Sequence, residues 1–477
     1  MANLIHKVQL ITPPLGLAER YGNLAGAGSS APSLGLLMLA AVARYEGFPC
    51  AVVDASALAM APEELLGRLE EFRPDILGIS STTLAIAEAG RIAVEAKRLL
   101  PGLIVILGGP HVTAAPRETL TRYPVFDVAV IGEGEATFGE LLQALEAGKS
   151  PALVAGVLFR EGDCLVETEK RPFLTDLDSL PFPAWDLLEG FPDRYPPAPF
   201  KVRQLPAAIL VTSRGCPNTC IFCDRSVFGS SCHAFTARRV VAEIEELHRS
   251  YGVREFSLED DTFITFQKRL VDICRQLIDS KLGISWTCLG RVNHVSPENL
   301  ALMKQAGCWQ ISFGIESGSA NILDIIRKKV TLDQVRHAVR LCHEAGIHSK
   351  GFFIIGHPGE SRETLRETVR FALELPLDDM SVSFLTPFPG TELYERAAEF
   401  GSFDADWNRM NLLNAVFIPH GLTREEMMAA RNELLRRFYF RPRIIADYAG
   451  RLLRSPTMAK GFWNAFVSLV RSLRKGA

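Results

Sequence analysis

Short apolar runs rich in β-branched residues alternate with longer segments of helical periodicity along most of this chain. In the first third, the strand-like runs are VQLIT (8–12), AVVDA (51–55), ILGIS (76–80), LIVILGG (103–109) and FDVAVIGE (126–133). The helical segments between them include residues 34–47, 62–72 and 85–100. Continuous apolar strands separated by amphipathic helices are typical of a parallel sheet covered on both faces. We therefore predict an open α/β domain over residues 1–150.

Glycine and hydroxyl residues follow several of these strands, and the ligands of an open, flavodoxin-like (Rossmann-type) sheet bind at that edge. The candidate binding residues in the turns SSTT, GGPH and GEGEAT are Thr82, Thr83, Gly108, Gly109, Gly132 and Gly134. The G-x-G within GEGEAT lacks the third glycine and the position after the first strand that a dinucleotide fingerprint requires. A nicotinamide cofactor is therefore disfavoured. The alternative is that these glycines serve tight turns without a ligand.

The next segment, residues 151–205, has no sustained periodicity and is rich in proline, aspartate and aromatic residues. Such composition is typical of a connection between domains. A chain of 477 residues is also too long for one hydrophobic core. We predict a linker here, a second domain over residues 206–402 and a helical region over residues 403–477.

The ten cysteines are unevenly distributed, and the segment SRGCPNTCIFC after a strand-like run holds Cys216, Cys220 and Cys223. Thiolates with this C-x3-C-x2-C spacing can converge on one metal centre, and iron–sulfur clusters are held by such thiolates. Three ligands for four irons leave one iron open, as substrate chemistry at a metal requires. The alternative is a structural zinc site in which Cys232 or His233 is the fourth ligand.

The segment SRGCPNTCIFC resembles the cluster loop of the radical S-adenosylmethionine (SAM) superfamily. Strand-like runs and helices alternate again after it, with strands expected in residues 254–263, 284–291, 309–319, 348–361 and 380–394. With the strand before the cysteines these make six β/α units, similar to the partial (β/α)6 barrel of that superfamily. The resemblance implies that Cys216, Cys220 and Cys223 bind a [4Fe–4S] cluster.

The same resemblance implies contacts with SAM at the carboxyl ends of the barrel strands. Phe222 and Gly356 would lie near the adenine, Arg291 near the carboxylate, and Glu316 near the ribose or the amine. The acidic run Glu259, Asp260 and Asp261 takes the place of the motif that meets the methionine amine. For each carboxylate the alternative is a helix cap or a surface ion pair.

A flavodoxin-like domain ahead of a radical SAM barrel resembles the cobalamin-dependent branch of the superfamily. The turns with Thr82, Thr83, Gly108, Gly109, Gly132 and Gly134 then face cobalamin. The first strand is not followed by D-x-H-x-x-G, so the implied cobalamin has no protein histidine as its lower ligand. His111 lies in the wrong loop for that task and is predicted to be a cap or surface residue.

These resemblances imply an enzyme that cleaves SAM reductively, takes electrons from a donor such as flavodoxin or ferredoxin, and methylates an unactivated carbon of a small or lipophilic substrate. An oxidative cyclase of the magnesium-protoporphyrin ester type is the alternative. A methylthiotransferase would need three cysteines in the first domain, where Cys50 is alone. A non-enzymatic alternative is a cobalamin- or redox-responsive binding protein with a structural metal.

The tail, residues 441–477, carries eight Arg or Lys residues against one acid, Asp447. A basic amphipathic helix can lie in a membrane interface, and it can equally close the barrel or dock on the first domain. The net charge of −3 disfavours a nucleic-acid partner. Neither a signal peptide nor an apolar stretch of about 20 residues is evident. We therefore expect a cytoplasmic protein with peripheral membrane contact as an option.

Overall fold

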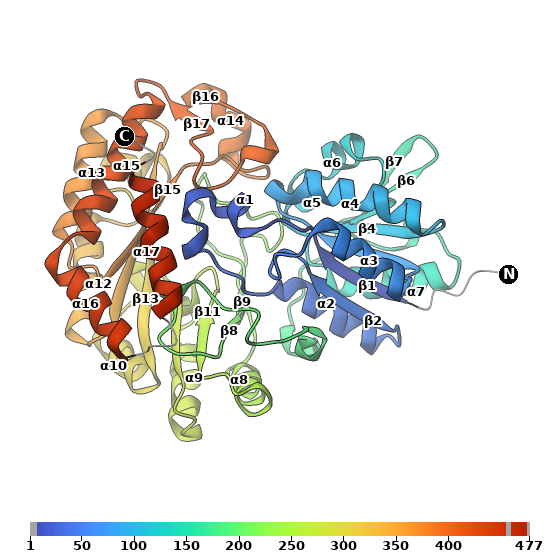
Figure 1. Cartoon of the computed structure of the whole chain (residues 1–477), viewed down its shortest axis with the longest axis horizontal. Coiled ribbons are helices and arrows are strands. Elements are labelled where there is room, and N and C mark those ends of the chain that lie inside the picture. Colours follow the sequence, from blue (N-terminus) through green and yellow to red (C-terminus); the bar gives the residue numbers. More distant parts are fainter. Residues whose placement is uncertain (1–6, 455–458, 475–477) are drawn as a thin grey trace.

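The computed structural model describes residues 7–454 and 459–474, which form two sheet-based domains and a C-terminal group of helices (Figure 1). The first sheet has the order β2-β1-β3-β4-β5-β6-β7, and its first five strands are parallel. The strands are β1 (Val8–Thr12), β2 (Cys50–Asp54), β3 (Ile76–Ser80), β4 (Ile104–Gly108), β5 (Val128–Val130), β6 (Val157–Glu161) and β7 (Cys164–Glu167). The predicted flavodoxin-like domain is thus confirmed.

Helices cover both faces of this sheet because successive strand side chains point to opposite sides. In β3, Ile76 joins one hydrophobic cluster with α2 (Leu34–Tyr45) and α7 (Glu135–Glu146). The next residue, Leu77, joins another cluster with α3 (Pro62–Phe72) and α4 (Ile86–Leu99). Both clusters are apolar, which is why the strands read as continuous hydrophobic runs.

The first sheet does not end where the linker was expected to begin. Strands β6 and β7 lie within residues 151–205 and pair antiparallel, β6 with β5 and β7 with β6. Their sequences, VLFRE and CLVE, are short, and the exposed outer strand has little apolar pattern. The hairpin therefore escaped detection from periodicity.

The second sheet has the order β15-β14-β13-β12-β11-β8 and is parallel throughout, which confirms six β/α units. Its strands are β8 (Ala207–Leu210), β11 (Glu255–Leu258), β12 (Ser285–Gly290), β13 (Cys308–Glu316), β14 (His348–Ile355) and β15 (Asp379–Phe384). The helices between them are α8 (Ala237–Tyr251), α9 (Gln267–Ser280), α10 (Pro297–Gln305), α11 (Ala320–Ile325), α12 (Leu332–Glu344) and α13 (Arg362–Glu374). Most of these helices start at a hydroxyl cap, such as Thr236, whose side chain accepts from Arg239 N.

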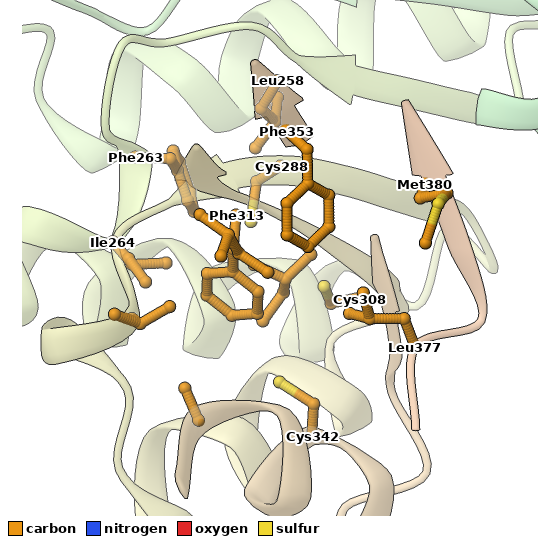
Figure 2. Close-up of a cluster of buried hydrophobic side chains, with 14 of the residues drawn as sticks. Leu258, Phe263, Ile264, Cys288, Cys308, Phe313, Cys342, Phe353, Leu377 and Met380 are labelled. Carbon is orange, nitrogen blue, oxygen red and sulfur yellow. The ribbon is translucent and has the colours of Figure 1, made fainter. Parts of the chain in front are cut away.

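The barrel core is built from large apolar side chains with small thiols between them (Figure 2). Cys288, Cys308 and Cys342 are fully buried beside Phe313 and Phe353. These cysteines, which lie outside the cysteine loop, are small core residues.

The remaining elements are short or lie near the chain end. They are α1 (Leu17–Tyr21), the 3-10 helix η1 (Gly22–Ala27), α5 (Pro110–Ala114), α6 (Pro116–Arg122), β9 (Ser213–Arg214), β10 (His233–Ala234), α14 (Glu392–Phe400), β16 (Gly401–Phe403), β17 (Phe417–Pro419), α15 (Arg424–Tyr439), α16 (Pro442–Arg454) and α17 (Ala459–Arg474). The C-terminal region is mainly helical, as predicted, with one added hairpin of β16 and β17.

The last helix of the basic tail packs against the first domain and keeps part of its surface exposed. Helix α17 lies along η1 of the first domain, beside α1 (Figure 1). Gly26 N donates to Ser468 Oγ at 3.2 Å, and Ala465 is fully buried. The sequence left open whether the tail contacts a membrane or docks on the protein, and in the structure α17 docks on the first domain. In the described ranges, no helix combines the length and apolarity needed to span a bilayer.

The contact between α17 and η1 predicts a specific glycine requirement. A Cβ at Gly26 would lie 2.5 Å from the Asn464 carbonyl oxygen, whereas a Cβ at Gly35 would meet no heavy atom within 4 Å. We expect Gly26→Ala to destabilise the protein by roughly 1–3 kcal/mol and to expose α17 to trypsin. The matched control Gly35→Ala, in a helix, should be neutral or stabilising by up to about 1 kcal/mol. Thermal unfolding and limited proteolysis measure both; equal behaviour of the two variants would contradict this packing.

Candidate active site

A cavity of about 1360 Å³ lies between the two domains. On one side it is lined by strand ends of the first sheet, including Thr12, Asp54 and Ser80. On the other side it is lined by residues of β14 and β15, including Lys350 and Ser383. The space is larger than the pockets that hold most small ligands, so it has room for more than one molecule.

The six turn residues predicted to face cobalamin meet at this cavity and at a second one of about 380 Å³. Thr82 and Thr83 line the large cavity, and the small one is lined by Gly108, Gly109, Gly132 and Gly134. Ser33 and Ser80 line both, so the two spaces adjoin.

Two of these glycines leave bare backbone beside open space. A Cβ at Gly108 or at Gly132 would meet no heavy atom within 4 Å. Gly109 is required for a different reason, because its φ is +100° and a Cβ would lie 2.8 Å from the Ser81 carbonyl oxygen. The turns thus form a cradle in which a large ligand can approach the main chain closely, as cobalamin would.

His111 is buried, which corrects its predicted place at a cap or on the surface. Its Nδ1 lies 3.1 Å from Thr83 Oγ1, and its Nε2 lies 3.2 Å from Thr119 Oγ1. The ring packs against Trp407 at 4.4 Å between centroids. Burial lowers the pKa of His111 to about 4, so the ring is neutral. His111 thus holds the Thr83 turn in place by a hydrogen bond, while its ring packs on Trp407.

The cysteine loop is fixed by a buried carboxylate. Asp260 accepts hydrogen bonds from Thr212 N at 2.6 Å, Thr212 Oγ1 at 2.7 Å and Ser213 Oγ at 2.5 Å. Asp260 is fully buried, and burial raises its pKa. Its oxygens are committed to the turn that leads to the cysteines, which leaves them unsuited to a ligand amine. This structural role is neither the helix cap nor the surface ion pair that was the alternative.

The three cysteines lie on one loop after this turn, and all are free thiols. Cys220 is buried and Cys216 half-buried, while Cys223 is open to solvent. Surrounding protein raises the pKa of Cys223 to about 12, and nearby Asp261, Cys220 and Cys216 act in the same direction. Bound cations would stabilise the thiolate form of these cysteines.

Cys232 Sγ donates to the Gly215 carbonyl at 3.3 Å, and burial with the nearby Cys216 and Asp261 raises the pKa of Cys232 to about 11. Within residues 7–454 and 459–474, no three His, Cys, Asp or Glu side chains are arranged to share a single metal ion. This holds alike for the set with Cys232 or His233 and for the three loop cysteines by themselves.

The acidic residues at the end of β11 make different contacts. Glu259 is paired with Lys201, both carboxylate oxygens lying 2.9 Å from Nζ. Asp261 is exposed, and its charge acts on Cys223 and Cys232. Desolvation, followed by the Asp260 charge, raises the pKa of Asp261. Asp261 is thus the member of the run that is open toward the cysteine loop.

Arg291 and Glu316 meet at Lys328, a residue that sequence reasoning missed. Arg291 Nη2 donates to the Lys328 carbonyl, and Lys328 Nζ lies 2.6 Å from Glu316 Oε1. All three side chains are buried, and Arg291 Nε has no hydrogen-bond partner among the described residues. Glu316 has a φ of +67°, a conformation that is strained for a residue with a side chain. Arg291 Nε is thus a donor unused by the described residues and itself covered by protein.

Phe222 and the turn at Gly356 come together as predicted, since the rings of Phe222 and His357 lie 6.0 Å apart. Gly356 has a φ of +98°, and a Cβ there would lie 2.5 Å from Met427 Cε. Gly356 N donates to Glu360 Oε2 at 2.5 Å, so this amide is committed within the protein. Burial lowers the pKa of His357 to about 3. The half-buried Phe222 offers an apolar surface for a planar group, and the fully buried His357 lies beside it.

A buried ionic group joins the cysteine loop to the first domain. Arg214, two residues before Cys216, lies 2.8 Å from Glu133 Oε1 and 2.5 Å from Glu135 Oε1. Both glutamates belong to the GEGEAT turn. The cysteine loop and the GEGEAT turn, which is predicted to face cobalamin, are therefore held together by charge-assisted hydrogen bonds.

The comparisons with known proteins agree with this arrangement. Residues 210–372 match the Radical SAM superfamily, and residues 22–142 match the B12 binding domain. An uncharacterized methyltransferase, PH0819 of Pyrococcus horikoshii, is 34% identical over 443 residues, which cover 92% of this chain and 94% of that protein. The chain belongs to the cobalamin-dependent radical SAM enzymes. Its cofactors are therefore a [4Fe–4S] cluster, SAM and cobalamin.

Further relatives of this radical SAM enzyme span different chemistries. The anaerobic magnesium-protoporphyrin IX monomethyl ester cyclase of Cereibacter sphaeroides is 32% identical, covering 82% of this chain and 64% of the cyclase. The methyltransferase TsrM of Kitasatospora setae, solved with cobalamin and a [4Fe–4S] cluster, superposes with a TM-score of 0.72 at 19% identity. That match covers 92% of this chain and 90% of TsrM, and it shows the shared fold.

Replacement of single cysteines tests the ligand set of this radical SAM enzyme. We expect Cys220→Ala to lose most of its iron and sulfide after anaerobic reconstitution, because two thiolates hold a four-iron cluster poorly. The control Cys232→Ala should retain both, since Cys232 bonds only to a carbonyl. Iron and sulfide analysis per chain measures this. Equal loss in Cys232→Ala would favour a four-ligand site and contradict the assignment.

The turn at Gly356 predicts a pH dependence of stability. Burial raises the pKa of Glu360 to about 8, from a usual value of 4.5. The folded state therefore binds more protons than the unfolded state between these values, and this group's contribution to stability falls as pH rises through the interval. We expect Glu360→Gln to gain stability relative to wild type from pH 5 to pH 8.5, by at most about 5 kcal/mol. Anaerobic urea denaturation at both pH values measures it; a constant difference would argue against a neutral buried carboxyl.

Proposed function

We propose that this enzyme is a C-methyltransferase acting on an unactivated carbon of a lipophilic substrate. The supporting observation is the cavity of about 1360 Å³, which adjoins the cobalamin-facing turns and runs along the inner side of the barrel. Most of its lining is apolar, with side chains such as Phe352, Phe388 and Leu435. A cavity shared by both domains gives a substrate access to the cofactors of each.

Each cofactor has its own set of binding residues in this proposal. Cys216, Cys220 and Cys223 hold the cluster, with Asp261 at its side for the methionine amine of SAM. Arg291 binds the SAM carboxylate through its unpartnered Nε, and Phe222 with the Gly356 turn flanks the adenine. Thr82, Thr83 and the glycines of the GGPH and GEGEAT turns face cobalamin.

When bound, the three cofactors supply one-electron cleavage of SAM and a transferable methyl group. The protein's part is to position these groups and to exclude water from them. Asp260 fixes the turn before the cysteines, Arg214 holds that turn to the first domain, and α17 covers the cavity beside η1. A one-electron donor such as flavodoxin or ferredoxin is the partner that this chemistry requires.

An oxidative cyclase remains the second candidate, because the Cereibacter sphaeroides cyclase is 32% identical. The two reactions differ in what becomes of SAM. Methyl transfer through cobalamin consumes SAM both as radical source and as methyl donor, whereas cyclisation consumes it only as radical source.

Product analysis distinguishes these reactions. We expect the anaerobically reconstituted, cobalamin-loaded enzyme to form both 5′-deoxyadenosine and S-adenosylhomocysteine after reduction, measured by liquid chromatography and mass spectrometry. The Cys220→Ala variant, treated identically, should form no 5′-deoxyadenosine. Formation of 5′-deoxyadenosine alone by the wild type would contradict methyl transfer and favour the cyclase.

A further inference from the structure

The outer part of the large cavity is lined by apolar side chains that remain exposed. Five of them, each close to half exposed or more, come from the C-terminal helices and the segment before them: Leu412, Phe440, Ile445, Trp463 and Phe466. Exposed apolar groups gathered around one opening mark a binding site rather than ordinary surface. They favour a substrate with a sizeable apolar body.

The charged residues of this cavity are unbalanced. Its lining includes four basic residues, Arg20, Lys201, Lys350 and Arg431, and two acidic ones, Asp54 and Glu259. Both lysines have a carboxylate partner: Lys201 pairs with Glu259 at 2.9 Å, and Lys350 lies 2.8 Å from an oxygen of Asp379. Asp54 accepts hydrogen bonds from Thr12 Oγ1 at 2.7 Å and from Ser33 N at 2.6 Å. The excess positive charge thus resides on the arginines.

Arg431, on α15, is the buried one of the two, with 7% of its surface exposed. Its Nε donates to the Val382 carbonyl at 3.1 Å, which fixes the guanidinium against β15. It forms no ion pair with any residue in the described part of the chain. Burial lowers the pKa of Arg431 to about 10, with no acidic neighbour to oppose the shift, and the group stays charged at neutral pH.

A buried guanidinium without a counter-charge is costly, and the cost falls when an anion binds it. The planar fork of arginine matches the two oxygens of a carboxylate or a phosphate. Arg431 lies on the barrel side of the cavity, whereas the cobalamin-facing turns belong to the first domain and the SAM carboxylate has Arg291. Its open guanidinium therefore serves another molecule.

We propose that Arg431 binds the carboxylate or phosphate of a lipophilic acid whose apolar body lies along the cavity and its exposed rim. This inference rests on the proposed function, because it identifies the class of substrate for the same site. Arg431 then fixes the head of the substrate and so determines which carbon is presented to the cofactors.

A matched pair of fluorescent probes tests the charge requirement. The probes are 11-(dansylamino)undecanoic acid and its neutral methyl ester, titrated into the cobalamin-loaded, cluster-containing enzyme without reductant. We expect the wild type to bind the acid at least 10-fold more tightly than the ester. Arg431→Met should weaken binding of the acid probe at least 10-fold and leave binding of the ester probe unchanged. Arg431→Lys should retain part of the preference for the acid over the ester.

The control variant is Arg437→Met, on the same helix but exposed and paired with Glu433 at 2.8 Å. It should bind both probes as the wild type does. Displacement of the acid probe by decanoate or by decyl phosphate then identifies the preferred anion. Equal binding of the acid and the ester by the wild type, or no binding of either probe, would overturn the proposal. Loss of cobalamin absorbance in both Arg431→Met and Arg431→Lys would also overturn it.

Because the probes are titrated without reduction, this result is independent of SAM cleavage. Failure to form 5′-deoxyadenosine with normal probe binding would contradict the proposed reaction alone. Normal SAM cleavage with equal binding of both probes would contradict the proposed substrate class alone.

Discussion

The geometry of parallel strands governs this molecule. Every strand of a parallel sheet delivers its following loop to the same edge, so residues far apart in sequence gather there. The protein does this twice, once with five strands of the first sheet and once with all six of the second. The turns with Thr82, Gly108 and Gly132 meet in this way, and so do the cysteine loop, Asp261 and Arg291. The cavity between the domains is lined by strand ends of the first sheet and by residues of β14 and β15, whereas the three cysteines, Asp261 and Arg291 are not among its lining residues.

Buried charge holds the loops in place at that boundary. Asp260 accepts hydrogen bonds from the turn that precedes the cysteines, and Arg214 on the same turn binds Glu133 and Glu135 of the first domain. Buried ion pairs contribute little net stability, but breaking one partner away is costly. Their consequence here is geometric: the cluster loop and a cobalamin-facing turn are kept in one arrangement before any cofactor binds.

Much of this could be predicted from the sequence where the signal is local. Continuous apolar runs located the strands, and the C-x3-C-x2-C spacing predicted the cluster ligands, an assignment that stays a prediction. The hairpin of β6 and β7 was missed because its outer strand is exposed and carries little apolar pattern. His111, Asp260, Lys328 and Arg431 were misjudged or overlooked for another reason. Their roles depend on partners from distant segments, such as Trp407 for His111 and Val382 for Arg431, and a single sequence does not reveal these pairings.

The central claim is that three thiolates hold a four-iron cluster whose remaining iron is open to SAM. Electron paramagnetic resonance of the anaerobically reduced protein tests it most directly, recorded with and without SAM. We expect the spectrum of a reduced [4Fe–4S] cluster whose g-values shift when SAM is added, because SAM then coordinates the open iron. A protein that binds zinc and gives no such signal, or a cluster whose spectrum SAM leaves unchanged, would contradict the account.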